Sequence, residues 1–334
     1  MRVLRGLETG PPPSGAIVTI GNYDGLHRGQ RAVLDRVIAI SRASAAPSMV
    51  VSFDPHPLFV LDPERAPKRL TTDPQRLRLL ESWGLDALLL LRFDPHLAAL
   101  SAESFVRDLL VGRLAVREIF VGSRFGFGRG RAGNLDLLQR LGAELGFRAS
   151  GVPELEIDGA PVSASRIRAL LEEGRAEAAA DLIGRPYAVL GEVVRGAHRG
   201  TELGFPTLNL DSENEILPRN GVYVVDIRLA GEAGARPGVA NVGVRPTIGE
   251  DERALVEAHL FDFDRSCYGE EVEVRFLRRI RAERRFPSLT ALRRQIGVDV
   301  EAAREYFRLR AGSPSRAGTT GEAPAEARSQ HGNL

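Results

Sequence analysis

Two glycine-rich segments of a kind that binds phosphate lie in opposite halves of this 334-residue chain. The first spans residues 21–30, GNYDGLHRGQ, and the second spans residues 200–209, GTELGFPTLN. Glycine allows the backbone to approach a phosphate closely and to form turns that other residues resist. A single nucleotide site needs only one such loop. The pair therefore predicts two active sites that handle nucleotide phosphates in succession.

The first segment follows a short apolar run at residues 17–20 and precedes a helical pattern that begins near Gly29. In such a strand–turn–helix unit, free backbone N–H groups and the helix dipole attract phosphate. Tight glycine turns after strands also serve packing. The residues of this segment alone leave the phosphate site and the packing turn equally open.

The second segment combines a strand, a glycine loop and a turn fixed by Pro206. Thr207 and Asn209 stand two positions apart and offer the hard oxygen ligands that Mg²⁺ prefers. Taken alone, the same residues are also compatible with a plain turn at the edge of a strand.

The N-terminal half alternates short apolar runs with longer amphipathic segments. The predicted strands are residues 16–20, 48–53, 87–91 and 118–121. The predicted helices are residues 29–42, 74–83, 102–110 and 135–145. Regular alternation of this kind predicts a doubly wound parallel sheet with helices on both faces, a Rossmann-like nucleotide-binding domain.

The pattern changes after two predicted helices at residues 163–173 and 176–183 and a break at residues 184–186, GRP. Strands are predicted at residues 187–194, 221–229, 239–242, 255–261 and 271–276, with a late helix from Leu289. This spacing predicts a small β-barrel followed by a C-terminal helix. We therefore expect domains at residues 1–184 and 185–310, and a disordered tail at residues 311–334 that lacks apolar periodicity.

Composition limits the class of protein. Lys and Arg total 45 against 44 Asp and Glu, a net charge of +1, which argues against nucleic-acid or membrane-surface partners. Cys267 is the sole cysteine, so no intrachain disulfide forms, and we expect it to be a small apolar residue in a strand. The longest apolar run is too short to span a membrane, and the start lacks the apolar stretch of a secretory signal. We expect a cytoplasmic monomer or weak homo-oligomer.

Further motifs extend the pattern of the first segment. They are residues 53–57 (FDPHP), 69–71 (RLT), 121–122 (VG), 125–128 (FGFG) and 162–168 (VSASRIR). In order and spacing, this half resembles the adenylyltransferase part of the prokaryotic bifunctional riboflavin kinase/FAD synthetase family, a branch of the HxGH-type nucleotidylyltransferases. The resemblance implies transfer of AMP from ATP to FMN, with release of pyrophosphate.

The resemblance also implies roles for residues. His27 would donate to the triphosphate, and Ser163 with Arg166 would form a second clamp at a helix N-terminus. We expect Arg168 to lie on a solvated helix face. The predicted nucleotide-binding residues are Gly21, Asn22, Asp24, Gly25, His27, Gln30, Arg124, Ser163 and Arg166.

Two positions depart from the family pattern. Gln30 replaces the second histidine, and loss of one preorganised donor costs on the order of 10²–10³ in rate. Arg124 stands where the family usually has Asp or Asn. One hypothesis is compensation, in which Arg124 supplies the cation that Gln30 lacks. The opposing hypothesis is decay of the adenylyltransferase activity.

The second segment resembles the riboflavin kinase signature of the same family, in which Pro-Thr-Ala-Asn holds Mg-ATP; here Leu208 replaces the alanine. Further matches are residues 218–223 (PRNGVY), 238–247 (GVANVGVRPT), 256–260 (VEAHL) and 268–269 (YG). The resemblance implies that Glu257 is the catalytic base and that Thr207 and Asn209 hold Mg²⁺. The predicted binding residues are Gly196, Gly200, Gly204, Phe205, Pro206, Thr207 and Asn209.

Together the two halves predict a bifunctional enzyme that converts riboflavin to FMN and then FMN to FAD, with ATP as co-substrate and Mg²⁺ as cofactor. The charged run at residues 278–285 is expected to form a solvated surface that partly covers the flavin. One alternative is a riboflavin kinase with an inactive adenylyltransferase domain. Another is a flavin-responsive binding or regulatory protein without turnover, which would not need a base at Glu257.

Overall fold

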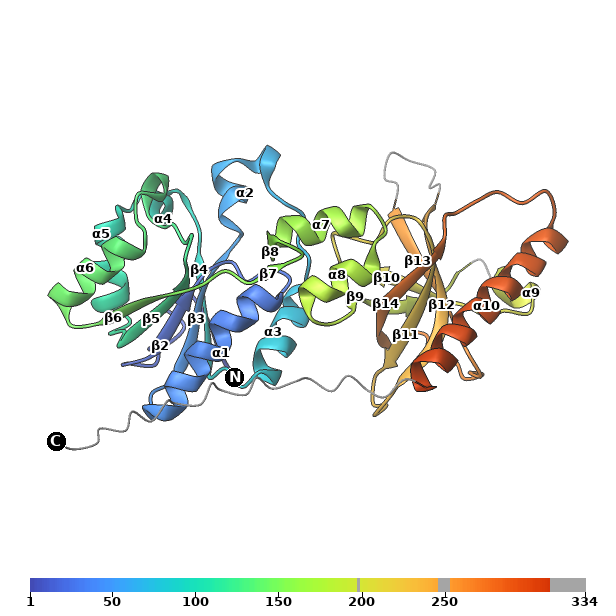
Figure 1. Ribbon diagram of the computed structural model, residues 1–334, viewed down its shortest axis with the longest axis horizontal. Coiled ribbons are helices and arrows are strands. Elements are labelled where there is room, and N and C mark those ends of the chain that lie inside the picture. Colours follow the sequence, from blue (N-terminus) through green and yellow to red (C-terminus); the bar gives the residue numbers. More distant parts are fainter. Residues whose placement is uncertain (197–198, 246–252, 313–334) are drawn as a thin grey trace, which may run out of the picture.

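The computed structural model describes residues 1–196, 199–245 and 253–312, and it places an α/β half beside a β-barrel half (Figure 1). The N-terminal sheet has six strands in the order β1-β4-β3-β2-β5-β6. They are β1 Arg2–Arg5, β2 Ile17–Ile20, β3 Ser48–Asp54, β4 Ala87–Arg92, β5 Glu118–Gly122 and β6 Arg148–Val152. Every neighbouring pair is parallel, which confirms the doubly wound sheet. The strand order reverses between β2 and β5, where such sheets open a crevice for ligands.

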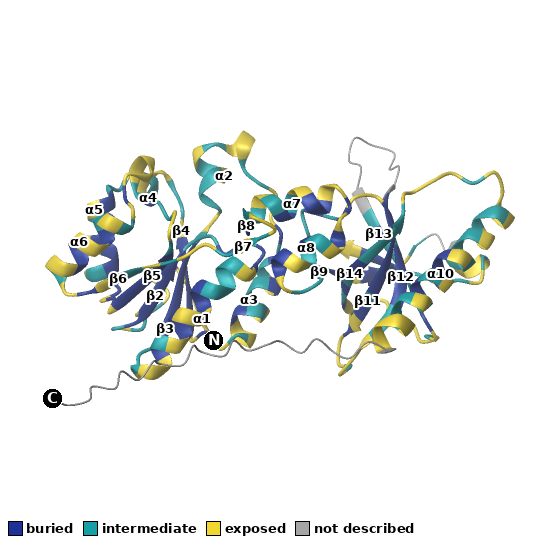
Figure 2. Ribbon diagram, viewed as in Figure 1, coloured by how far each residue is buried: buried dark blue, intermediate teal, exposed yellow. Residues whose placement is uncertain are grey.

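The strands of this sheet are mostly buried (Figure 2), and alternate strand residues join apolar clusters on its two faces. In β4, Leu88 and Leu90 join a cluster with Leu34 and Leu80 on one face. Leu89 and Leu91 of the same strand join the cluster on the other face, which contains Phe105, Leu138 and Leu141. This period of two explains why β4 is a continuous apolar run: both of its faces are covered.

The helices of this half are α1 Arg28–Ala43, α2 Pro57–Leu61, α3 Asp73–Ser82, α4 Pro95–Ala99, α5 Ala102–Ser104, α6 Leu135–Leu145, α7 Ala164–Glu172 and α8 Ala176–Ile183. The helix predicted over residues 102–110 is divided into α5 and a π-helical stretch, Phe105–Val111. A short hairpin, β7 Glu156–Ile157 and β8 Ala160–Pro161, precedes α7. Strands β1 and β6 were not predicted, because more than half of their residues are at least partly exposed and they lack an apolar run.

The C-terminal half is a closed antiparallel barrel in the order β10-β13-β12-β11-β14-β9, as predicted. Its strands are β9 Tyr187–Val194, β10 Leu208–Ser212, β11 Gly221–Leu229, β12 Ala235–Arg245, β13 Arg253–Leu260 and β14 Glu271–Arg281. A short helix, α9 Arg199–Glu202, precedes β10, and α10 Leu289–Gly312 ends the described chain. Cys267 is buried, but it lies in the connection between β13 and β14 and not in a strand, which corrects that expectation. Residues 311 and 312 belong to α10, and the rest of the predicted tail lies outside the described residues.

Helices α7 and α8 join the two halves (Figure 1). Ile167, Leu171 and Leu182 from these helices belong to one buried apolar cluster with barrel residues such as Val225 and Phe276. The barrel therefore does not bury its core alone. Among the described helices, none is long and apolar enough to cross a membrane.

Candidate active sites

The turn between β2 and α1 is held in a strained shape by contacts from distant parts of the chain. Tyr23, Gly25 and Leu26 have positive φ angles of 48°, 79° and 46°. Such angles are rare for Tyr and Leu and require support from the surroundings. Arg185 provides part of it, because its guanidinium donates to the Gly25 and Leu26 carbonyls, both at 2.8 Å.

His27 ends this turn and caps α1. Its Nδ1 accepts a hydrogen bond from the Gln30 backbone N–H at 3.3 Å, and the Gln30 side-chain oxygen accepts one from the His27 N–H at 3.2 Å. Burial, aided by the charges of Arg185 and Arg168, lowers the pKa of His27 to about 4. The imidazole is therefore neutral near pH 7. Because Nδ1 accepts, the ring proton is on Nε2, which makes Nε2–H the donor of this imidazole.

Asp24 fastens the same turn to the segment before α3. Its carboxylate accepts hydrogen bonds from the Leu70 N–H at 2.9 Å and the Thr71 N–H at 3.2 Å. Arg168 completes the arrangement with an ion pair of 2.6 Å. The side chain of Arg168 is only 15% exposed, so the expectation of a solvated helix face was wrong. The reason is that α7 packs against the turn, which brings Arg168 to Asp24. The two residues lie 144 positions apart, so the helix pattern alone does not reveal the pair.

A cavity of about 300 Å³ opens beside this turn, at the carboxyl ends of β2 and β3. Asn22 lies in its wall, with its side-chain amide 2.7 Å from Nε2 of His56. The cavity is lined by Asn22, Asp24, Phe53, Asp54, Pro55, His56, Phe59, Arg69, Thr71, Asp73, Arg76 and Glu215. Aromatic side chains and arginines together suit a ligand with both a flat apolar ring and an anionic group.

Ser163 lies at the start of α7, close to the start of α1, whereas Arg166 and Arg124 bond elsewhere. Ser163 caps α7, since its hydroxyl oxygen accepts from the Arg166 N–H at 3.3 Å. The start of α7 adjoins the start of α1: a Cβ placed on Gly29 would lie 3.3 Å from the His27 ring and 3.5 Å from the Val162 carbonyl oxygen. Two helix N-termini therefore converge where phosphates are expected.

The guanidinium of Arg166 turns toward the β7–β8 hairpin, where it donates to the Ile157 and Ala160 carbonyls at 2.8 and 3.0 Å. Arg124 is 68% exposed and forms an ion pair of 2.6 Å with Glu154. Its charge is thus already matched by a carboxylate in this structure. Neither arginine is among the residues that line the cavity.

The barrel half holds a larger cavity of about 870 Å³ between the strands, the β10 entry loop and α10. Three polar side chains from adjacent strands form one row along its wall. Asn209 of β10 pairs in register with Glu257 of β13, and Glu257 pairs with Asn241 of β12. All three line the cavity, as does Thr207. The structure therefore brings the predicted base and both predicted metal ligands to one surface.

Glycines before β10 allow the loop to pass close to these residues. A Cβ on Gly196 would lie 2.2 Å from the Asn209 amide nitrogen, and one on Gly200 would lie 2.9 Å from Thr207 Oγ1. Gly204 has a φ of 84°, and the next residue, Phe205, donates its N–H to the Gly200 carbonyl at 2.8 Å. Larger residues at Gly196 and Gly200 would push the loop away from the Thr207 and Asn209 oxygens.

The lip of this cavity is formed by the end of β14 and by α10. Arg281 bonds the buried Asp299 at 2.7 Å, which ties the strand to the helix. Arg284, Arg285 and Phe286 line the cavity just beyond the strand. The charged run is therefore placed beside the cavity, and Arg281 within it is mostly buried.

The oxygen atoms at this site suit a hard cation. Asn209 Oδ1 is buried and has no hydrogen-bond partner among the described residues. A buried acceptor without a donor is costly unless a ligand satisfies it. The described residues contain no group of three or more His, Cys, Asp or Glu that could hold a metal ion. Thr207 and Asn209 are the predicted ligands that would hold Mg²⁺ at this site.

Known proteins match both halves. Residues 11–166 match the FAD synthetase family model, and residues 183–307 match the riboflavin kinase family model. The bifunctional riboflavin kinase/FMN adenylyltransferase of Escherichia coli K12 is 40% identical over 92% of this chain and 99% of its own length. The Pseudomonas fluorescens protein of the same name is 39% identical over 91% of this chain and 97% of its own length. The chain belongs to the bifunctional riboflavin kinase/FMN adenylyltransferase family.

A solved structure supports the arrangement of both halves. The crystal structure of a protein from Streptococcus pneumoniae, named a macrolide-efflux protein, superposes with a TM-score of 0.83 at 29% identity. It covers 91% of this chain and 99% of that chain. The likeness therefore extends through both halves of this member of the bifunctional family.

Some residues at these sites were not singled out from the sequence of this bifunctional family member. In the sequence, Arg185 marks only a domain break and Glu215 belongs to no motif, although Glu215 lines the N-terminal cavity from the barrel half. His56 and Arg69 stand in the sequence only as parts of family motifs. The sequence signal for such residues is a polar or charged side chain near a glycine or proline turn. It does not identify their partners, because the partners of His56, Arg69 and Arg185 lie 34 to 160 residues away.

Proposed function

We propose that this chain makes FAD in two ATP-dependent steps. Riboflavin and ATP give FMN and ADP at the barrel cavity, and FMN and ATP then give FAD and pyrophosphate at the N-terminal cavity. The observation that carries the proposal is the row of Asn209, Glu257 and Asn241 in one cavity, combined with a capped, glycine-rich nucleotide turn in the other half. We assign the two activities to residues 185–310 and 1–184.

For the kinase step, Glu257 is the proposed base. Its carboxylate takes the proton of the riboflavin 5′-hydroxyl as that oxygen attacks the γ-phosphorus of ATP, and ADP leaves. The row geometry supports this role because Glu257 adjoins Asn209 across the β10–β13 pair. The glycine loop from Gly196 to Gly204 and the adjoining Phe205–Pro206 turn are proposed to hold the nucleotide.

Mg²⁺ is proposed as the cofactor of the kinase step. Thr207 and Asn209 would hold it, and when bound it would neutralise charge on the nucleotide phosphates. Asn209 Oδ1 is buried and has no hydrogen-bond partner among the described residues, which supports the proposal that a ligand binds it. The glycine contacts place the loop backbone close to both side chains.

For the adenylyl step, an FMN phosphate oxygen attacks the α-phosphorus of ATP and pyrophosphate leaves. This reaction needs mainly positioning and charge stabilisation. The proposed donors are the Nε2–H of His27 and the free N–H groups at the starts of α1 and α7. Gly21, Asn22, Asp24, Gly25 and Ser163 would shape this site. Gln30 would contribute to this site indirectly as well, because it orients His27 through the capping box.

Two of the proposed binding residues, Arg166 and Arg124, have other partners in this structure. Arg166 would have to leave the β7–β8 carbonyls to reach a phosphate, and Arg124 would have to leave Glu154. Compensation by Arg124 would therefore require this ion pair to break, and the proposed adenylyl transfer relies instead on the donors of His27, Gln30 and the two helix starts.

The remaining proposals concern partners and location. We propose riboflavin, FMN, FAD and ATP as the ligands, without nucleic acid or membrane, and a monomer or weak homo-oligomer in the cytoplasm. A kinase with an inactive adenylyltransferase half is the nearest alternative, since it requires only that Gln30 cannot replace the second histidine of the family pattern as a donor. A regulatory protein without turnover leaves the Glu257 row unexplained.

The test is incubation of the purified protein with riboflavin, Mg²⁺ and ATP, with riboflavin, FMN and FAD separated over time. FMN followed by FAD is the expected result. FMN alone would reject the adenylyl step, and the absence of both products would reject catalysis. A parallel incubation with FMN and ATP isolates the second step from the first.

A further inference from the structure

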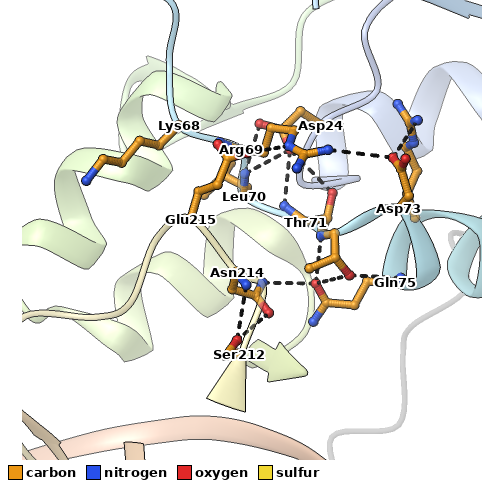
Figure 3. Close-up of polar contacts among 12 residues, drawn as sticks. Asp24, Lys68, Arg69, Leu70, Thr71, Asp73, Gln75, Ser212, Asn214 and Glu215 are labelled. Atoms are coloured by element: carbon orange, nitrogen blue, oxygen red, sulfur yellow. Dashed lines mark hydrogen bonds and ion pairs between the residues drawn. The ribbon is translucent and has the colours of Figure 1, made fainter. Parts of the chain in front are cut away.

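The barrel half contributes a side chain to the cavity of the other half. Of the described residues that line the 300 Å³ cavity, Glu215 is the one that comes from beyond Arg76. It lies on the connection that follows β10, facing the segment before α3 (Figure 3). A residue of the proposed kinase domain thus forms part of the proposed adenylyltransferase site.

Glu215 holds one residue at two points. Its Oε2 accepts a hydrogen bond from the Arg69 backbone N–H at 2.6 Å, and its Oε1 accepts one from Arg69 Nε at 2.6 Å. The contact with Nε fixes the direction of the guanidinium, and the contact with the backbone fixes the chain beneath it. Charge-assisted hydrogen bonds of this kind are short and directional.

The next two residues connect Arg69 to the nucleotide turn. Leu70 and Thr71 donate their N–H groups to Asp24, as Figure 3 shows. Asp24 in turn belongs to the turn that leads to His27. The segment of residues 69–71 is therefore held at one end by Glu215 and at the other by Asp24. Both of these carboxylates line the cavity.

The connection that carries Glu215 is itself fixed to the barrel. Asn214 accepts the Leu190 N–H at 2.9 Å and donates to Gln75 Oε1 at 3.0 Å. The carbonyl of Ile216 accepts the buried Tyr187 hydroxyl at 2.8 Å. Neighbours on both sides of Glu215 are thus bonded in place, which gives its carboxylate a defined position.

We propose that Glu215 is a positioning residue for adenylyl transfer: it fixes Arg69 in the wall of the cavity where the phosphate-bearing flavin, FMN, binds. This inference rests on the proposed function. Phe53 and Phe59 supply apolar walls for the ring system, and Arg69 supplies a cation for the phosphate. Glu215 does not touch the reacting atoms and acts only through Arg69.

The test uses the full chain and measures adenylyl transfer with FMN and ATP supplied directly. Glu215→Gln keeps the shape but loses the charge, and we expect it to raise the KM for FMN roughly tenfold. The KM for ATP and the kcat should stay within about twofold. Riboflavin phosphorylation by the same preparation should be unchanged, which shows that the barrel is folded.

Two controls separate positioning from general loosening of the interface. Glu213→Gln changes an exposed carboxylate two residues away and should leave the KM for FMN unchanged. Arg78→Ala removes another ion pair between the two halves, the 2.6 Å contact with Glu271, without touching this cavity. It should also leave that KM unchanged.

A double-mutant cycle with Arg69→Ala decides whether Glu215 acts through Arg69. If it does, adding Glu215→Gln to Arg69→Ala changes the KM for FMN no further. Additive effects, an unchanged KM in Glu215→Gln, or an equal rise in Arg78→Ala would each overturn the proposal. An unaltered protein that makes no FAD from FMN would instead reject the adenylyl function, and the positioning role with it.

Discussion

His27 and Gln30 form a closed pair at the start of α1, in which each residue accepts a hydrogen bond from the backbone N–H of the other. Neither Nε2–H of His27 nor the amide N–H₂ of Gln30 takes part in this pair of hydrogen bonds. The residue that replaces the second histidine of the family therefore has a structural task and a donor to offer.

Substitution of Gln30 by Glu separates these two tasks. Glu at this position still accepts the His27 N–H, so the cap remains, but it no longer donates and carries a negative charge. We expect adenylyl transfer to fall by about 10²–10³, as for loss of a preorganised donor, with little change in stability. Initial rates of FAD formation from FMN would show this. A rate equal to that of the unaltered protein would mean that Gln30 only caps the helix.

Arg124→Ala tests the compensation hypothesis independently. Because Arg124 is exposed and paired with Glu154, we expect the rate of adenylyl transfer to remain within about twofold. A tenfold loss in the same assay would instead show that the cation leaves Glu154 and acts on the substrate, and the compensation hypothesis would then stand.

The pKa of His27 predicts a pH-dependent stability. Its folded pKa of about 4 lies below the ordinary value of 6.5, so between these values the unfolded chain binds a proton that the folded chain does not. The contribution is complete above pH 6.5 and is lost as the pH falls toward 4, by up to about 3 kcal/mol. Protonation would also convert the Nδ1 acceptor of the cap into a donor.

His27→Asn keeps a capping side chain and removes the titration. Urea unfolding of this variant should therefore depend less on pH between 6.5 and 4 than unfolding of the unaltered protein. The fluorescence of Trp83, the one tryptophan, reports on this half because Arg31 of α1 lies 4.4 Å from its ring centre. His56, whose pKa burial also lowers, leaves some pH dependence in both proteins. Equal pH dependence in the two would refute the assignment.

Arg168→Ala should destabilise the N-terminal half. It removes the cation from the Asp24 carboxylate at a site where both side chains are largely buried, and such losses cost about 3 kcal/mol. Asp24 keeps its backbone donors, so we expect folded protein with a weakened nucleotide turn and slower adenylyl transfer. Arg175→Ala, which breaks an exposed pair with Glu173, is the matched control and should change the free energy of unfolding by less than about 0.5 kcal/mol.

Glu257→Gln should abolish most kinase activity. Loss of a general base typically costs 10² to 10⁴ in rate, roughly, while the neutral amide keeps the size of the side chain. FAD formation from supplied FMN should be unaffected, because Glu257 lines only the barrel cavity among the described pockets. Glu192→Gln, on the exposed face of β9, serves as control. FMN formation at the unaltered rate would exclude Glu257 as the base.

The magnesium proposal predicts a change in metal requirement. Asn209→Ala and Thr207→Val should each raise the Mg²⁺ concentration needed for half-maximal riboflavin phosphorylation, because each removes an oxygen ligand. Thr207→Ser keeps the hydroxyl and should behave as the unaltered protein. Titration of the initial rate with MgCl₂ at saturating ATP measures this. An unchanged requirement in both Ala and Val variants would place the metal elsewhere.

Much of the fold could be predicted from local pattern. Strands β9 and β11 and helix α6 were predicted with the bounds that the structure has, because each shows a clear periodicity ended by glycine or proline turns. Strand β10 was missed because its five residues follow a proline turn and alternate polar side chains with only two leucines. It is a strand because β9 and β13 hold it on both sides.

The candidate sites were predictable where a motif is local and less so where it is not. The turn before α1 and the Thr207–Asn209 spacing are visible in the sequence, and family resemblance directed attention to Glu257. The ion pair of Arg168 with Asp24 joins residues 144 positions apart, and that of Arg69 with Glu215 joins residues 146 apart. No helical or strand period carries information about such partners, so the sequence could not assign them.

The strand that provides Asn209 to one cavity continues into the connection that provides Glu215 to the other. The two catalytic halves are therefore not independent modules. If Glu215 positions Arg69 as proposed, a chimera that joins the barrel of one relative to the nucleotide-binding half of another would need compatible residues at positions 69 and 215, even if each half folded well. The site of the domain junction alone does not decide whether such an exchange works.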